Sequence, residues 1–400
     1  MRAFFQPCLL VIAALFGLCG SAAAQTSPAP SNAAPSDAAP EAKSPLSLGG
    51  YVEALYQWNF NNPSNGISNF RGFDNRHNHF TLSNVALDAQ MDHDGILGRL
   101  ALQIGHTPST YYLAEPSAPG SAGANASGAE LWKYLQQAYA GYRFGSGMQV
   151  SAGLFLSPIG PEGMVVHENW NWSRSNLFFG LPFYHTGVRV EQPLNARWTL
   201  KLGAFNGWNS VVDNNSEKSL AAQLTYTLPE KLALSMLYFA GVERPRDAPE
   251  GRAWRHLFDA HATWMVSARL SLLGHFNLGF EPNHFGISSW VAGALYGRFQ
   301  LIPELFIAAR ADAFYEKGAS NRNGSASSIF WPVPWVASGT ATLEFLPHDH
   351  VSFRLEYRHD HASGSMFFGG PVTGDGTGES PFLANRSAQN TLTIGATSWF

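Results

Sequence analysis

The 400-residue chain is 45% hydrophobic but only 14% charged, and it contains 39 glycines. A disordered chain would be rich in charge and poor in aromatic residues, so this composition excludes one. The formal net charge of −4 gives no excess of basic residues that would indicate nucleic-acid binding. Aromatic residues make up 13% of the chain, which is high for a cytosolic enzyme.

The N-terminus has the pattern of a secretory signal. Arg2 precedes an apolar run at 9–18, which is followed by small residues that include Ala22 and Ala24. We therefore predict that residues 1–24 form a cleaved signal peptide. A retained membrane anchor is the alternative, but the apolar run falls short of the ~20 residues that a spanning helix needs.

Both cysteines, Cys8 and Cys19, lie in this segment, so the exported chain would have no disulfide and no cysteine metal site. Cys19 also suggests a lipoprotein signal as an alternative. Leu18 disfavours it, because such a signal has a small residue directly before the cysteine. Residues 25–45 form an Ala/Pro/Ser stretch with five prolines, which predicts an extended periplasmic linker.

From residue 46 onward, apolar and polar residues alternate. Val351, Phe353 and Leu355, for example, alternate with Arg354 and Glu356. Successive side chains of a strand point to opposite faces, so this pattern predicts strands with one apolar and one polar face. The sixteen predicted strands cover 46–60, 79–91, 96–106, 131–144, 148–156, 183–192, 197–206, 218–228, 231–242, 255–266, 269–280, 288–301, 305–316, 335–346, 350–361 and 388–400.

The predicted connections alternate strictly in length. The odd-numbered ones are long, from 61–78 to 362–387, and 281–287 is the shortest of them. The even-numbered ones, such as 92–95 and 229–230, are tight. An even number of antiparallel strands, with short turns at one end and long loops at the other, is typical of an outer-membrane β-barrel.

A soluble sandwich would show the same alternation, but three features favour a barrel in lipid. Trp and Tyr residues such as Trp58, Trp254 and Trp290 gather near strand ends, and the chain carries a secretion signal. The last strand ends in the aromatic Phe400. We predict that 46–400 is an all-β, transmembrane antiparallel up-and-down β-barrel of about 16 strands, surrounded by lipid in the outer membrane of a Gram-negative-type cell.

Two stretches resemble a known family. One is Leu181–Arg189 (LPFYHTGVR), and the other runs from Asn206 (NGWN) to Lys218. Together they resemble the OmpL-like β-barrel porins. The resemblance implies an outer-membrane channel, and the family has no established catalytic residues to carry over. The terminal Phe400 is similar to the assembly signal of bacterial outer-membrane barrels, which implies recognition by the barrel assembly machinery.

Metal binding and catalysis are alternative interpretations of the polar residues, which could otherwise line a pore. Three His-X-His clusters begin at His77, His348 and His359, but two ligands make an incomplete site. Ser173 and His185 are near Asn171 in the sequence, yet no nucleophile-elbow or H-E-x-x-H motif occurs. We expect no metal, no cofactor and no enzymatic activity.

The predicted function is passive diffusion of small hydrophilic solutes through a water-filled porin. The alternatives are a substrate-specific or gated transporter, and after that a surface adhesin or outer-membrane enzyme. Many porins are trimers, so a homotrimer is compatible with the sequence, although no feature identifies a subunit interface. By alternation, the expected pore wall includes Arg189, Lys201, Arg310, Asp312, Arg354, Glu356 and Arg358.

A sixteen-stranded ring is too wide to sieve small solutes unless a segment folds into it. The long connection 157–182 is the candidate constriction, because it contains aromatic residues to pack against the wall and glycines and prolines to bend. We expect Arg310, Arg354 and Arg358 on the opposing wall. A loop over the mouth or projecting outward is the alternative. If the connection folds inward to form the constriction, its water-facing residues are expected to be Glu162, His167, Glu168 and Arg174.

Overall fold

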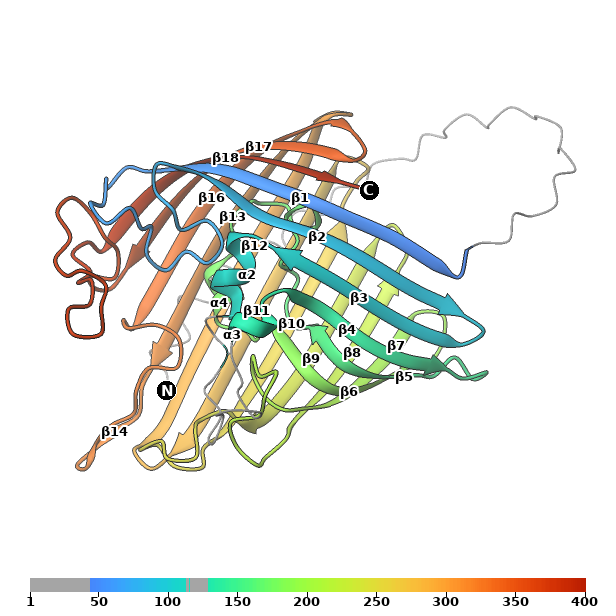
Figure 1. Ribbon diagram of the computed structural model, residues 1–400, viewed down its shortest axis with the longest axis horizontal. Coiled ribbons are helices and arrows are strands. Elements are labelled where there is room, and N and C mark those ends of the chain that lie inside the picture. Colours follow the sequence, from blue (N-terminus) through green and yellow to red (C-terminus); the bar gives the residue numbers. More distant parts are fainter. Residues whose placement is uncertain (1–43, 113–114, 116–128) are drawn as a thin grey trace, which may run out of the picture. The chain divides into compact units, whose positions relative to one another are not determined.

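The computed structural model describes residues 44–112, 115 and 129–400, so the predicted signal peptide and nearly all of the linker lie outside it. Sixteen antiparallel strands form one closed barrel, which confirms the predicted fold (Figure 1). In this part of the chain, no helix is long and apolar enough to cross a membrane. The barrel strands are β1 (Leu46–Asn59), β2 (His79–His93), β3 (Ile96–Ile104), β4 (Leu135–Arg143), β5 (Gln149–Leu156), β6 (Tyr184–Pro193), β7 (Trp198–Phe205), β8 (Ser219–Leu228), β9 (Leu232–Val242), β10 (Trp254–Met265), β11 (Leu270–Asn283), β12 (Gly286–Ile302), β13 (Leu305–Lys317), β16 (Trp335–His348), β17 (Val351–Ala362) and β18 (Ala388–Trp399).

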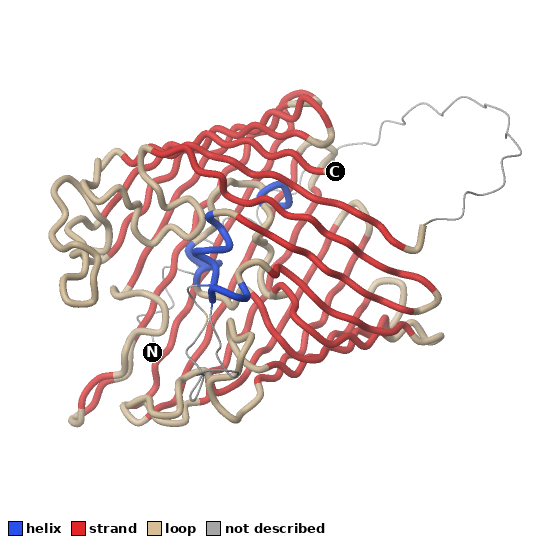
Figure 2. Tube along the Cα trace, viewed as in Figure 1, coloured by secondary structure: helices blue, strands red, loops and turns tan. Residues whose placement is uncertain are grey.

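The remaining elements are short. They are the helices α2 (His106–Tyr111), α3 (Ala129–Trp132) and α4 (Asn176–Phe179), the 3-10 helix η3 (Val166–Glu168), and the hairpin of β14 (Ser320–Asn321) with β15 (Gly324–Ser325). All of them lie on connections between barrel strands, and the long connections gather at one end of the strands (Figure 2).

The barrel closes through the first and last strands. Tyr51 of β1 pairs with Trp399 of β18, and the register continues to Asn59 opposite Thr391. Each barrel strand therefore has two hydrogen-bonded neighbours, and no edge remains. Closure is required in hydrocarbon, because each unpaired backbone group would cost several kcal/mol there.

The two faces of each strand differ as the alternation predicts. On β17, Phe353, Leu355 and Tyr357 are exposed on the outer face, whereas Arg354 and Arg358 are buried inside. The outer face of this strand is thus apolar, and the inner face is charged. Trp290 departs from the expected aromatic girdle, because it points inward and is only 3% exposed within an apolar interior cluster.

The tight connections are hairpin turns. Between β2 and β3, Asp94 and Gly95 both have positive φ angles, as the common two-residue hairpin turn requires. One connection predicted to be long is also tight, because β11 and β12 extend until Asn283 pairs with Gly286. The Asn283 side chain accepts a hydrogen bond from Phe285 N at 2.9 Å, which closes the turn locally.

Parts of four long connections fold into the barrel and build an apolar core there. Leu181, Trp208, Trp331 and Phe367 come from four different connections and belong to one buried cluster. The same cluster contains inward side chains of the strands, such as Phe314. At the end of the barrel with the long loops, the interior is therefore partly filled by packed apolar residues, which the alternation pattern does not indicate.

Candidate functional site

The connection between β5 and β6, residues 157–183, crosses the barrel interior and is called the inward segment below. It leaves from β5 and carries η3 and α4. Helix α4 lies against β12, β13 and β16. Because β13 is eight strands from β5 in either direction around the ring, the inward segment spans the interior from one wall to the opposite one.

The inward segment is fixed first on the wall formed by β8 and β10. Gly160 N donates to Asp259 Oδ1 at 3.2 Å, and Gln223 Nε2 donates to the Pro158 carbonyl at 3.1 Å. Gly160 has a φ of 77°, and a Cβ at this position would lie 2.8 Å from the Leu181 side chain. This bend therefore needs glycine both for its backbone angle and for its close packing.

Buried carboxylates hold the inward segment on the far wall. Glu356 of β17 accepts hydrogen bonds from Trp172 N at 2.6 Å and from Ser173 N at 2.9 Å. Glu53 of β1 accepts from Val166 N at 2.6 Å, and Asp312 of β13 accepts from Asn176 N at 3.0 Å. These bonds satisfy backbone donors that a buried irregular segment would otherwise leave unpaired.

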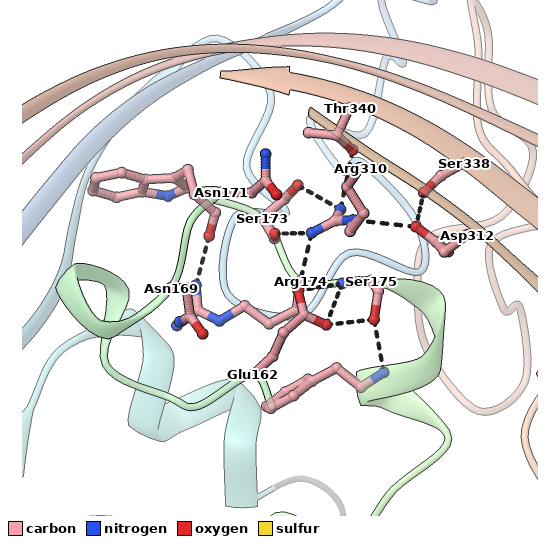
Figure 3. Close-up of polar contacts among 12 residues, drawn as sticks. Glu162, Asn169, Asn171, Ser173, Arg174, Ser175, Arg310, Asp312, Ser338 and Thr340 are labelled. Atoms are coloured by element: carbon pink, nitrogen blue, oxygen red, sulfur yellow. Dashed lines mark hydrogen bonds and ion pairs between the residues drawn. The ribbon is translucent and has the colours of Figure 1, made fainter. Parts of the chain in front are cut away.

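Arginines of the same wall bind the carbonyl groups of the inward segment. Figure 3 shows Arg310 reaching Ser173, Thr340 and Asp312; its bond to the Ser173 carbonyl is 2.5 Å long. Arg354 donates to the Val166 carbonyl at 2.9 Å. Alternating carboxylates and guanidiniums thus match the donors and acceptors of one extended backbone.

This arrangement corrects one expectation. The sequence predicts Arg310, Arg354 and Arg358 on the wall opposite the inward segment, whereas in the structure they lie directly beneath it and bind it. Arg310 pairs with Glu162 at 3.0 Å, and Arg358 donates to the Arg174 carbonyl. Buried backbone carbonyls need donors, and the guanidinium groups of this wall supply them.

The four predicted constriction residues have different environments. Glu162 binds Ser175 N at 3.0 Å and Arg310, and its side chain is only 7% exposed. Arg174 is buried among carbonyls, with 2.6 Å to that of Trp172, and burial lowers its pKa. His167 stacks on Trp399 with ring centroids 4.5 Å apart, and only Glu168 is well exposed.

The wall on the other side of the interior is more open. Lys201 of β7 pairs with Glu191 of β6 at 2.8 Å, and their side chains are 37% and 31% exposed. Arg189 of β6 is also partly exposed, with its guanidinium 4.1 Å from the centroid of the Phe155 ring. The predicted wall residues therefore fall into a buried set under the inward segment and an exposed set on β6 and β7.

Some residues that shape the site were not singled out by the sequence. Tyr139 lies under the Arg189 guanidinium, and Gly395 leaves room for the Trp172 ring, which a Cβ there would approach to 2.2 Å. Alternation places Tyr139 on the inner face of its strand, so the signal was present. The pairing of Gly395 with Trp172 joins positions far apart in the chain and leaves no local signal.

The structure does not assemble the catalytic set considered above. Ser173 contacts Arg310 and Glu356, whereas His185 contacts the Ser157 hydroxyl at 3.2 Å and the Gly207 carbonyl at 3.1 Å. Over residues 44–112, 115 and 129–400, no three His, Cys, Asp or Glu side chains are arranged to hold a metal ion.

The two stretches that carried the family resemblance contact each other. Phe183 N donates to Asn209 Oδ1 at 2.5 Å, and His185 Nδ1 lies 3.1 Å from the Gly207 carbonyl. Glu243, just after β9, accepts from Trp208 N at 2.7 Å. The end of the inward segment and the connection between β7 and β8 thus form one packed unit.

The family model described as "Putative beta-barrel porin-2, OmpL-like" matches residues 45–400. The chain belongs to this porin family. It is an outer-membrane porin channel, as the sequence predicted, and no curated protein matches it significantly.

Solved porins share the fold of this porin at very low sequence identity. The anion-selective porin from Comamonas acidovorans is 10% identical, with a TM-score of 0.56, and the match covers 89% of this chain and 99% of that one. Outer-membrane-expressed OmpT of Vibrio cholerae is 10% identical, with a TM-score of 0.55 and coverage of 89% and 97%. Salmonella typhi OmpF in complex with daunomycin is 9% identical, with a TM-score of 0.55 and coverage of 89% and 97%.

Proposed function

We propose that small hydrophilic solutes diffuse passively through this porin, between the inward segment and the more exposed wall formed by β6 and β7. The observation that carries the proposal is the course of the inward segment, which crosses from β5 to the opposite wall and is held there by a buried ion pair and buried hydrogen bonds. A fixed segment across a wide ring leaves a narrower passage on the side where side chains remain exposed.

Within this proposal, the predicted site residues have two roles. Glu168 on the inward segment and Arg189 and Lys201 on the exposed wall border the passage. The buried set keeps the inward segment in place and does not touch solutes. It consists of Glu162, Arg174, Arg310, Asp312, Arg354, Glu356 and Arg358.

Several further properties are part of the same proposal. The porin performs no catalysis, and residues 1–24 are removed on export, leaving 25–45 as a linker before the barrel. Phe400 is 71% exposed beside the last strand, which suits recognition by the barrel assembly machinery. OmpT of Vibrio cholerae has a trimer form, and we propose a homotrimer for this porin also.

A gated or substrate-specific transporter is the second candidate. It is favoured by the apolar core that four connections build inside the loop end of the barrel. Solutes entering there would depend on movement of packed loops, whereas a general porin needs none. Single-channel recording separates the two: steady ohmic steps favour passive diffusion, and a closed barrel that opens only with one solute favours the transporter.

Shortening the inward segment tests the passage directly. Deletion of residues within 162–178 should raise single-channel conductance several-fold and weaken discrimination by solute size, because the barrier across the ring is removed. Deletion of 376–379 is the matched control: these residues are exposed at the tip of a turn that Asp375 N closes on the Ser380 carbonyl at 2.9 Å. If the shortened barrel folds but conducts as before, the passage lies elsewhere.

A further inference from the structure

Arg189 differs from the other cationic side chains of the barrel wall. Eight other arginine and lysine side chains on the strands face the interior, and each has a nitrogen within 3.2 Å of a carboxylate oxygen. The Arg189 side chain has no carboxylate partner and makes no hydrogen bond to any residue of 44–112, 115 or 129–400. Its charge is therefore not neutralised by the wall around it.

Two aromatic rings hold the Arg189 guanidinium in place. Its central carbon lies 4.1 Å from the centroid of the Phe155 ring and 4.8 Å from that of Tyr139. Phe155 is only 1% exposed, so this support is itself fixed in the wall. Cation–π contacts hold the position of the guanidinium but use none of its five N–H donors.

The neighbouring inward positions leave the guanidinium uncovered. Its register partners are Ser151 on β5 and Gly203 on β7, and Gly187 precedes it on the same face of β6. The Phe205 ring lies over both glycines: a Cβ at Gly203 would be 2.3 Å from the ring, and a Cβ at Gly187 would be 2.9 Å from it. None of these three inward positions carries a long side chain, and Phe205 is itself only 4% exposed, so the half-buried Tyr139 is the accessible aromatic ring beside the cation.

We propose that Arg189 forms an anion-binding subsite on the pore wall, which takes the carboxylate of a small monocarboxylate with an apolar group. A carboxylate matches the fork of N–H donors, and an apolar substituent fits against the half-buried Tyr139. The neighbouring interior cations Lys201 and Arg99 are already paired, with Glu191 at 2.8 Å and with Asp88 at 2.6 Å, so the site has one uncompensated positive charge. The proposal rests on the proposed diffusion pathway, since it places a binding step within it.

The test compares two variants that each remove one interior cation. Arg189→Gln deletes the subsite, and Arg143→Gln deletes a cation paired with Asp92 at 2.7 Å near the turns. In planar bilayers, benzoate should reduce the chloride current saturably for the wild type and for Arg143→Gln. For Arg189→Gln, the half-blocking concentration should rise at least tenfold, which corresponds to about 1.4 kcal/mol. Arg189→Lys should lie between them, because an ammonium keeps the charge but loses the fork.

Isothermal titration of the folded full chain in detergent with benzoate and with acetate measures binding without any need for conduction. Saturable benzoate binding that Arg189→Gln abolishes and Arg143→Gln retains supports the subsite, with acetate binding more weakly. Equal binding by all three proteins, or no binding by the wild type, overturns it. A wild type that binds benzoate but never conducts would refute the diffusion pathway and leave the subsite standing.

Discussion

Two walls of the same barrel interior have the same kind of residues but different environments. On β13 and β17, Arg310 and Glu356 are 3% and 1% exposed and hold the inward segment. On β6 and β7, Glu191 and Lys201 form a pair whose side chains are about a third exposed. Alternation decides which side chains face the interior, and the course of one connection decides which of them meet water.

This difference has an energetic consequence. A buried ion pair loses much more than an exposed one when a single partner is removed, because the remaining charge cannot be solvated. The buried wall should therefore affect the stability of the inward segment, and the exposed wall should affect only the ions that pass.

The largest effect is expected for Arg310→Met. It would leave Asp312 and Glu162 without their cation, and we expect docking of the inward segment to weaken by ~3–5 kcal/mol. Lys201→Gln, on the exposed wall, should cost ~0–1 kcal/mol. The release of the inward segment is measured by limited proteolysis of the folded barrel, as the rate of cleavage within residues 157–183. Equal protease resistance of the two variants would show that the walls do not differ in this way.

A smaller effect is expected for Glu356→Gln, which keeps the shape of the side chain. A neutral amide can accept at only one oxygen, so one of the bonds from Trp172 N and Ser173 N is lost. We expect a loss of ~1.5–3 kcal/mol in docking, visible as more frequent current fluctuations in single-channel records. Glu191→Gln is the control on the exposed wall, and it should leave the fluctuations unchanged.

The sequence predicted the barrel wall far better than its contents. Alternation and turn chemistry are local, so the strands and most turn positions followed directly from them. The inward segment was identified by its length and by its glycines, prolines and aromatic residues. Its contacts could not be predicted, because Glu53 and Val166 meet across 113 positions of the chain. The unpaired state of Arg189 likewise depends on where every carboxylate of the interior lies.

The smallest effect concerns pH and His167 on the inward segment. Burial and the nearby Arg354 guanidinium lower the pKa of His167 from 6.5 to about 4. The docked segment therefore binds a proton at His167 less readily than the released segment does. Docking is strongest above pH 6.5 and weakens as the pH falls from 6.5 to about 4. Below about pH 4, the strength of docking changes little further. Current fluctuations should rise over that interval in the wild type, and His167→Gln should remove this part of the pH dependence. Other interior groups also titrate there, so the difference between the two proteins is the quantity to measure; identical profiles would mean that His167 does not couple docking to pH.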